Sequence, residues 1–544
     1  MIMHFIFLTK SFLCLAAMPL STTNAVPVAQ DFTDLKTRAE RTEYRETSHY
    51  EDVIAFITAL QAKGALIKLE YIGKSEGGRQ IPFVIASKPT VASRSEARKL
   101  GKAIVYIQAN IHGGEVEGKE AVQMLLRELS GKDSGKLLDK LVILVTPVFN
   151  IDGNEKWGDG RRNRSSQDGP ELIGERPNGQ GLDLNRDSMK AEAHETRAAL
   201  EHIYTTWDPD VMIDLHTTDG TRHGYHLTYS PPLNANTLAG IVSYSRELLS
   251  TVRSRMDKEH SQKTQDYGNV EGRTGQRAWR TFGEEGRYVT NYVGLRNRVS
   301  ILSEAASFLP FKTRVETTLY FVKTILEEIA RRPSRVTSLT RDADKKVTDW
   351  GRKPETAPPL GVRFEMDSRG EEDIPLEKPK PGEQIDRRKA PTDLEMNKLL
   401  IFDRFKSTKT AKLPAAYIIP GEFTNVAELL RRHGIKVEML KSAWNGEADV
   451  FTIKEMVQAP EAFQGHRLVR LEGTFATGKA EAPAGSFIVR LAQPLGILIF
   501  NLLEPESLDG VAAWGFLEGR LNTGTNYPIL KAIGPVTVRT GRTP

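Results

Sequence analysis

The 544-residue sequence predicts an α/β fold: a mostly parallel or mixed sheet flanked by helices, followed by a C-terminal α+β domain. Three observations support this prediction. Short apolar segments typical of buried strands alternate with amphipathic segments between about residues 100 and 310. A segment rich in proline and charged residues follows, from about residue 340 to 395. Strand-like and helical patterns then return near Leu399.

Four continuously apolar segments are predicted to be strands of the sheet: residues 103–109, 141–149, 211–215 and 299–302. Residues 118–129 are predicted to form a helix, because their apolar positions share one face. Apolar strands that alternate with helices favour a sheet covered on both faces. Ligands of such sheets bind at the carboxyl ends of the strands, so the residues that follow these strands are candidates for chemistry.

The N-terminal segment has the pattern of a secretory signal peptide. Lys10 supplies a positive charge, residues 11–20 form a short apolar run, and small residues precede a predicted cleavage site near Ala25. The run is too short to span a bilayer, which takes about 20 apolar residues. We therefore expect residues 1–25 to be a signal peptide and the mature protein to be secreted or periplasmic, without stable membrane insertion.

Cysteine content and charge narrow the range of functions. Cys14 is the single cysteine, so a mature chain without the signal peptide would hold no disulfide, no thiolate nucleophile and no Cys-ligated metal. A metal would have to be bound by His, Asp or Glu. The 75 basic and 70 acidic residues leave a net charge of +5, which is too small at this length to predict a nucleic-acid partner.

The pattern predicts three segments after the signal peptide. Residues 26–335 are expected to form the α/β domain, 336–396 a linker rich in proline and charge, and 397–544 a C-terminal α+β domain. In the last segment, residues 424–433 are predicted to be a helix that stops at Gly434. Strands are predicted over residues 467–471, 486–491 and 497–502.

Three of the predicted strands are followed closely by an ionisable residue. His112 and Glu115 lie in a glycine-containing turn, His216 ends a second strand, and Glu304 ends a third. His and Glu three residues apart can reach one ion, and a catalytic zinc site uses three N or O ligands. Each motif alone is weak, since a polar turn or a hydrogen-bonded structural histidine would look the same. Glu304 needs a partner, because an unpaired carboxylate is costly to bury.

Together with the segment GLDLNRD at residues 181–187, these motifs resemble the zinc carboxypeptidase family (the M14 peptidases) over about residues 65–330. The resemblance implies a carboxypeptidase-like fold and one Zn²⁺ per chain. It further implies that the zinc ligands are His112, Glu115 and His216, and that Glu304 is the general base and acid.

The resemblance implies roles for further polar residues. Asn185 and Arg186 would bind the carboxylate at the end of a substrate, and Asp183 would orient the first zinc histidine. Arg161 would polarise the scissile carbonyl, with Arg162 and Arg164 as rival choices. Tyr288 and Tyr292 lie near the place of the family's mobile tyrosine, but neither spacing matches well, and a core or surface position is favoured for each.

These observations predict a secreted zinc-dependent metallocarboxypeptidase that hydrolyses a peptide bond near a free C-terminal carboxylate. One alternative is a zinc amidase or deacylase acting on cell-wall peptides or N-acyl amino acids. Another is a non-catalytic binding protein on the same scaffold. The expected partner is a peptide or peptide-like substrate. The C-terminal domain could cap the cleft, bind a substrate or pair chains.

Other motifs are interpreted as structural. Gly73–Gly77 matches the Gly-x-Ser-x-Gly pattern of serine hydrolases, but it lies between two predicted strands and is better explained as a hairpin turn. His223 and His226 are expected to line the cleft or pack locally. His194 and His202 are expected on the surface of an amphipathic helix.

Overall fold

The computed structural model describes residues 31–131, 135–273, 275–378, 384–537 and 539–542. The predicted signal peptide, including Cys14, lies outside this part of the chain. Among the described residues, no helix combines the length and apolarity needed to cross a bilayer.

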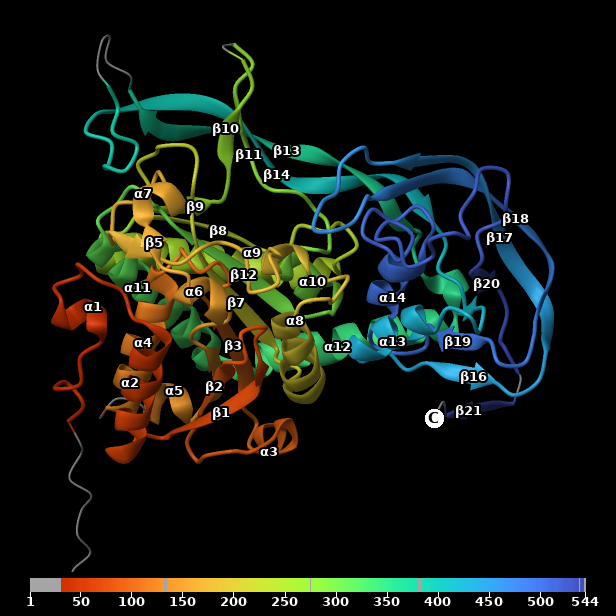
Figure 1. Ribbon diagram of the computed structural model, residues 1–544, viewed down its shortest axis with the longest axis horizontal. Coiled ribbons are helices and arrows are strands. Elements are labelled where there is room, and N and C mark those ends of the chain that lie inside the picture. The colour runs from red at the N-terminus through yellow and green to blue at the C-terminus, as the bar shows by residue number, and fades with distance from the viewer. Residues whose placement is uncertain (1–30, 132–134, 274, 379–383, 538, 543–544) are drawn as a thin grey trace, which may run out of the picture.

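An eight-stranded mixed sheet forms the centre of the N-terminal part, in the order β1-β2-β4-β3-β7-β12-β8-β9 (Figure 1). The strands β4, β3, β7 and β12 run parallel, whereas β1, β2 and β4 pair antiparallel and β8 runs antiparallel to β12. The bounds are β1 (Ile67–Lys74), β2 (Gln80–Ala86), β3 (Ala103–Ala109), β4 (Leu141–Thr146), β7 (Val211–Thr217), β8 (Leu227–Ser230), β9 (Thr264–Asp266) and β12 (Val299–Ala305). The predicted α/β class with a mixed sheet is confirmed, and the four predicted strands correspond to β3, β4, β7 and β12.

Long helices cover this sheet. The predicted helix over residues 118–129 is α4, and it packs with α9 and α12 around the buried helix α11. The bounds are α2 (Tyr50–Ala62), α4 (Glu117–Ser130), α9 (Ala239–His260), α10 (Val289–Leu295), α11 (Phe311–Arg331) and α12 (Pro333–Arg352). An aromatic cluster joins the sheet to the helices α10 and η2 (Ala199–Trp207), because Tyr204 contacts both Tyr106 and Tyr292 edge to face.

Short elements connect these layers. The helices are α1 (Arg38–Arg41), α3 (Arg94–Lys99), α5 (Gly135–Leu138), α6 (Ile151–Glu155), α7 (Gly160–Asn163), η1 (Leu184–Arg186), α8 (His194–Ala198) and η3 (Pro354–Thr356). The strands β5 (Gly158–Asp159) and β6 (Leu172–Ile173) form a two-stranded sheet. The turn between β1 and β2 holds Ser75, whose hydroxyl donates to Asp152 Oδ1 at 2.9 Å, so the hairpin interpretation of Gly73–Gly77 is confirmed.

The C-terminal part is rich in sheet. A seven-stranded sheet has the order β18-β17-β20-β15-β19-β16-β21, and the helices α13 (Thr424–Arg432) and α14 (Gly496–Leu503) accompany it. Its strands are β15 (Ala416–Ile419), β16 (Glu438–Leu440), β17 (Trp444–Gln458), β18 (Val469–Ala482), β19 (Phe487–Arg490), β20 (Leu530–Ala532) and β21 (Thr540–Arg542). The predicted helix over residues 424–433 is therefore confirmed as α13, and an α+β composition is present.

The expected linker over residues 336–396 differs from the structure. Much of it belongs to α12 and to a long hairpin of β13 (Leu360–Glu377) and β14 (Leu394–Ala411), which passes over the top of the molecule in Figure 1. The hairpin pairs with β11 (Ala278–Arg280), which pairs in turn with β10 (Asn269–Glu271). Most residues of the two long strands are exposed or only partly buried, so the strands lack the apolar alternation that identifies a strand in sequence. The domain limits near residues 335 and 397 stay predictions.

The predicted strand over residues 497–502 is wrong, because this segment forms the helix α14. Every residue of α14 is buried and all but Asn501 are apolar, so the segment shows no 3.6-residue period. A short apolar run of this kind cannot be assigned to helix or strand by periodicity alone.

The helix α12 connects the two parts of the molecule tightly. A Cβ atom at Gly351 would collide with the backbone of Leu491 and Ala492 in the C-terminal part.

We expect Gly351→Ala to lower the free energy of unfolding by about 1–3 kcal/mol, the usual cost of overpacking. Urea unfolding followed by circular dichroism measures this. Gly478→Ala is the matched control, since a Cβ there meets no atom within 4 Å. Equal unfolding midpoints for the two variants would contradict this packing.

Candidate metal centre and active-site cleft

The parallel register of the sheet brings two candidate residues side by side. The strands β7 and β12 pair so that His216 lies directly opposite Glu304. The strand β3 pairs with the other side of β7 and ends just before the turn that carries His112 and Glu115. The carboxyl ends of three adjacent parallel strands therefore supply all four side chains to one edge of the sheet.

Asn110 shapes the turn that carries His112 and Glu115. Its φ of 60° places it in the left-handed region and turns the chain out of β3. Its side-chain amide donates to the carbonyl oxygens of His112 at 3.1 Å and Glu115 at 3.0 Å. Gly113 and Gly114 leave room for close packing, because a Cβ at Gly113 would collide with the backbone of Gly153. The turn is therefore held rigidly before the helix α4 begins.

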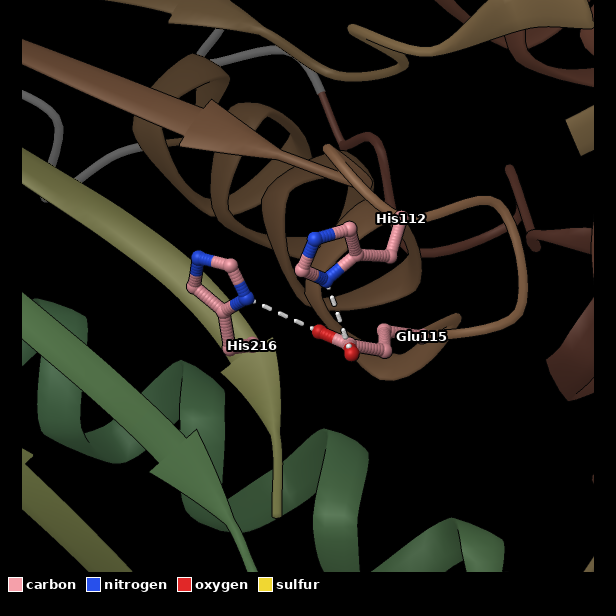
Figure 2. Close-up of side chains that lie close together, drawn as sticks. All are labelled: His112, Glu115 and His216. Atoms are coloured by element: carbon pink, nitrogen blue, oxygen red, sulfur yellow. Dashed lines mark hydrogen bonds and ion pairs between the residues drawn. The ribbon is translucent and has the colours of Figure 1, made fainter. Parts of the chain in front are cut away.

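Three side chains converge at this edge, as Figure 2 shows. The Glu115 carboxylate lies between the two imidazoles, with Oε1 2.9 Å from Nδ1 of His112 and Oε2 2.9 Å from Nδ1 of His216. Their potential ligand atoms all lie within 4.8 Å of one another, and all three residues are buried. The Nδ1 atoms of both histidines thus face the same carboxylate.

The opposite ring nitrogens are held by carboxylates. Nε2 of His112 lies 3.0 Å from Asp183 Oδ1, and Nε2 of His216 lies 2.8 Å from Asp214 Oδ2. Asp214 and His216 are two residues apart on β7, so their side chains share one face of the strand. A carboxylate on the far nitrogen of a histidine orients the ring and fixes its tautomer for metal binding.

This donor set fits a zinc ion. Two imidazole nitrogens and one carboxylate are a ligand set that catalytic zinc uses, and three protein ligands leave a coordination position open for water or substrate. The carboxylates behind both imidazoles supply the outer-shell support that such ligands need. The acidic surroundings of the histidines also favour a bound cation.

The three side chains His112, Glu115 and His216, here called the triad, lie in a cleft of about 430 Å³. Glu304 lines this cleft and is partly buried. Removal from bulk water raises the pKa of Glu304 to about 8, the charges of Glu115 and Asp219 add to this, and His216 opposes it. A dication at the triad would lower this pKa again, so the group would change its proton affinity with the charge beside it.

Asn185 and Arg186 also line the cleft. Asn185 follows Asp183, and its Oδ1 accepts from the backbone N–H of Val289 at 3.0 Å. The guanidinium of Arg186 stacks on the ring of Tyr288, 4.4 Å from its centroid. Tyr288 therefore borders the cleft, whereas Tyr292 is buried and bonded to His433. Tyr292 thus occupies a core position, as expected. Tyr288 instead lies beside Arg186, the candidate substrate-binding arginine.

The structure does not bring Arg161 to the cleft. Its side chain is exposed on α7, a short helix whose N-terminus is capped by Asp159. Arg164, one of the rival choices, is used structurally: it donates to Glu115 Oε1 at 2.8 Å and to the carbonyl of Thr217 at 2.8 Å.

Arg176, and not Arg161, lines the cleft. Its guanidinium lines the cleft, with Nη1 3.3 Å from His112 Nδ1 and Nη2 2.8 Å from Asp183 Oδ2. The side chain is 41% exposed, so one face remains open to a substrate. Arg176 and Asp214 are two site residues that the sequence analysis missed. Asp214 could have been found from its i, i+2 spacing to His216 on one strand.

The other histidines lie elsewhere. His223 packs among the rings of Tyr225, Trp279 and Phe308, and burial lowers its pKa to about 4. His226 Nδ1 accepts from the backbone N–H of Lys263 at 3.1 Å. Both therefore pack locally. His194 and His202 are exposed, as expected.

Comparison with known proteins identifies a family for the N-terminal part. Residues 53–301 match the model of the zinc carboxypeptidase family. This range includes both histidines and Glu115, and it ends three residues before Glu304.

Individual relatives extend the match. Carboxypeptidase 2 of Trichophyton tonsurans is 25% identical over 489 residues, which cover 84% of this chain and 81% of that protein. Carboxypeptidase D of Drosophila melanogaster is 26% identical over 168 residues, covering 29% of this chain and 11% of that protein. Among solved structures, a metallo-carboxypeptidase from Burkholderia cenocepacia is 17% identical, with a TM-score of 0.39 over 52% of this chain and 70% of that chain.

We expect Asp214→Asn to weaken zinc binding by about 10–100-fold, because it removes the charge that orients His216. Competition with a chelator of known zinc affinity measures the dissociation constant. Asp219→Asn is the matched control, since it removes a carboxylate that lines the same cleft with an exposed side chain. If both variants bound zinc equally well, the role of Asp214 would be refuted.

Glu284 lies in the chain between Phe282 and Tyr288, which both line the cleft. It is 7% exposed, and burial, with the charge of Glu285 second, raises its pKa from 4.5 to about 7. The folded protein therefore holds the proton of Glu284 more tightly than the unfolded chain does. The resulting stabilisation is fully present below pH 4.5, and the free energy of unfolding falls as the pH rises to about 7.

Replacing Glu284 should remove this loss. Between pH 4.5 and 8, Glu284→Gln should gain up to about 3 kcal/mol in unfolding free energy relative to wild type. Urea titrations across this range measure the difference, with the exposed Glu51→Gln as control. A difference between Glu284→Gln and wild type that stays constant with pH would contradict the raised pKa.

Proposed function

Because residues 53–301 match the zinc carboxypeptidase family, we propose that the protein removes residues from the C-termini of peptides with one bound Zn²⁺ per chain. His112, Glu115 and His216 would hold the zinc. The observation that carries this proposal is the convergence of both Nδ1 atoms on the Glu115 carboxylate, in a cleft that also contains Glu304 and Arg186.

Zinc bound at this triad would lower the pKa of water and polarise a carbonyl. Glu304 is proposed as the group that accepts the proton of the attacking water and passes it to the leaving amide nitrogen. Its position opposite His216 on the neighbouring strand supports this, since the carboxylate lies beside the triad without being one of its ligands. The products are a shortened peptide and a free amino acid.

Arginines are proposed to bind the two substrate groups that carry negative charge. Arg186, with Asn185, would hold the terminal carboxylate, because its planar guanidinium offers two parallel donors. Arg176, in place of Arg161, would stabilise the negative charge that develops on the scissile carbonyl oxygen. Its contact with His112 and its exposed face support this assignment.

Location and domain organisation extend the proposal. A signal peptide cleaved near Ala25 would deliver the mature enzyme outside the cytoplasm. Residues 26–335 would form the catalytic domain and residues 397–544 the C-terminal domain, with α12 and the hairpin β13–β14 between them.

Zinc content per chain and hydrolysis of a mixed peptide library, followed by mass spectrometry, test the function. One zinc per chain with single residues lost from C-termini is the expected outcome. One zinc without peptide cleavage would favour amidase or deacylase substrates, or a binding role. A chain that binds no zinc would overturn the proposal.

Glu304→Gln should retain stoichiometric zinc but lower kcat by a factor of about 100 to 10,000, because the amide cannot accept the proton. Steady-state kinetics and metal analysis of the same sample separate the two effects. The exposed Glu395→Gln on β14 is the matched control. Full activity of Glu304→Gln would show that another group transfers the proton.

A further inference from the structure

We propose that the C-terminal part of the chain completes the catalytic cleft through one tight turn, Phe463–His466, and that Phe463 is a specificity-determining residue. This inference rests on the proposed function and deepens it. Phe463 would contact the side chain of the substrate's C-terminal residue and favour large apolar side chains there. The turn connects β17 to β18 and lies outside residues 53–301, so it is an addition to the part of the chain that matches the family.

The turn has a defined backbone. Phe463 and His466 exchange both backbone hydrogen bonds, at 2.8 and 3.1 Å. The two central residues, Gln464 and Gly465, have φ values of 51° and 83°, as a type I′ turn requires. A glutamine in the left-handed region costs free energy, so surrounding contacts must hold it there.

Two side chains of the turn bind the segment that carries the candidate substrate-binding residues. The side-chain oxygen of Gln464 accepts from the backbone N–H of Asp183 at 2.8 Å. Nε2 of His466 lies 2.9 Å from Glu192, further along the same segment. Asp183 contacts His112 and lies two residues before Asn185. The turn is therefore attached directly to the wall of the cleft.

The ring of Phe463 is fixed from its other side. It stacks on Trp514 with 6.2 Å between ring centroids, and the guanidinium of Arg287 lies 5.4 Å from its centroid. Arg287 also lies 5.0 Å from Trp514 and forms an ion pair with Asp509 at 2.7 Å. Arg287 precedes Tyr288, on which Arg186 stacks, so Phe463 is placed near the end of the cleft that would hold the terminal carboxylate.

Phe463 remains 36% exposed although it is large and apolar, and it lines the same cleft as the triad. The nearby cleft surface has an apolar component supplied by Phe282, Tyr288 and Leu302. An apolar ring held in place before substrate arrives loses little conformational freedom on binding. Burying it against an apolar side chain removes both surfaces from water, which favours such substrates over small ones.

The test compares two peptides that differ only in a C-terminal Leu or Gly, on the full-length zinc-loaded protein. Phe463→Ala should lower kcat/KM for the Leu peptide about tenfold and leave that of the Gly peptide within about twofold. Phe463→Leu, which keeps an apolar side chain, should recover most of the selectivity. Val457→Ala, an exposed change on the same hairpin, should leave both values unchanged. Zinc content should be the same in all variants.

The outcomes separate the inference from the proposed function. If wild type is active and Phe463→Ala affects both peptides equally or neither, Phe463 does not set specificity and the inference is overturned. If Phe463→Leu behaves like Phe463→Ala on the Leu peptide, an apolar contact is not the cause, and the inference also fails. If zinc-loaded wild type removes no C-terminal residue from either peptide, the proposed function fails and the inference falls with it.

Discussion

The arrangement of the site depends on one constraint: a buried carboxylate, Glu115, lies between the Nδ1 atoms of two buried histidines. Burying these groups is costly unless each is paired or bound to a cation. The far nitrogens are held by Asp183 and Asp214, so the Nδ1 atoms, which face Glu115, are the ring nitrogens turned toward the candidate metal position. The rest of the local structure maintains this geometry, from the left-handed Asn110 to the parallel register of β7 and β12.

The same constraint explains why so many charges gather at one edge of the sheet. Carboxylates surround the triad, and Arg164 and Arg176 offset part of their charge. Arg164 is enclosed by its partners, whereas Arg176 keeps an exposed face toward the cleft. The two arginines near Glu115 therefore differ in accessibility. The side chain of Arg164 is largely covered by its hydrogen-bond partners, whereas that of Arg176 is open to a molecule in the cleft.

The cleft is bordered by segments that are far apart in the chain. Residues from the β3 turn, the 183–186 segment, β7 and β12 form most of it, and the turn Phe463–His466 reaches it from the C-terminal sheet. The close packing of α12 against residues 491–492 and the ion pair of Arg287 with Asp509 hold the two parts together. The C-terminal part therefore contacts the candidate catalytic machinery directly.

The sequence by itself determined the four adjacent parallel strands of the sheet, β4, β3, β7 and β12, and the candidate residues of the metal centre. Buried parallel strands are apolar runs, and each of three such runs precedes a potential ligand or base, so the pattern is local. The tertiary structure alone decided the rest. Whether Arg161, Arg164 or Arg176 faces the cleft depends on how a loop folds, and the packing around α14 decided that its apolar run is a buried helix and not a strand. The contact of Gln464 with Asp183 joins residues 281 positions apart, and such a contact leaves no periodic signal in the chain.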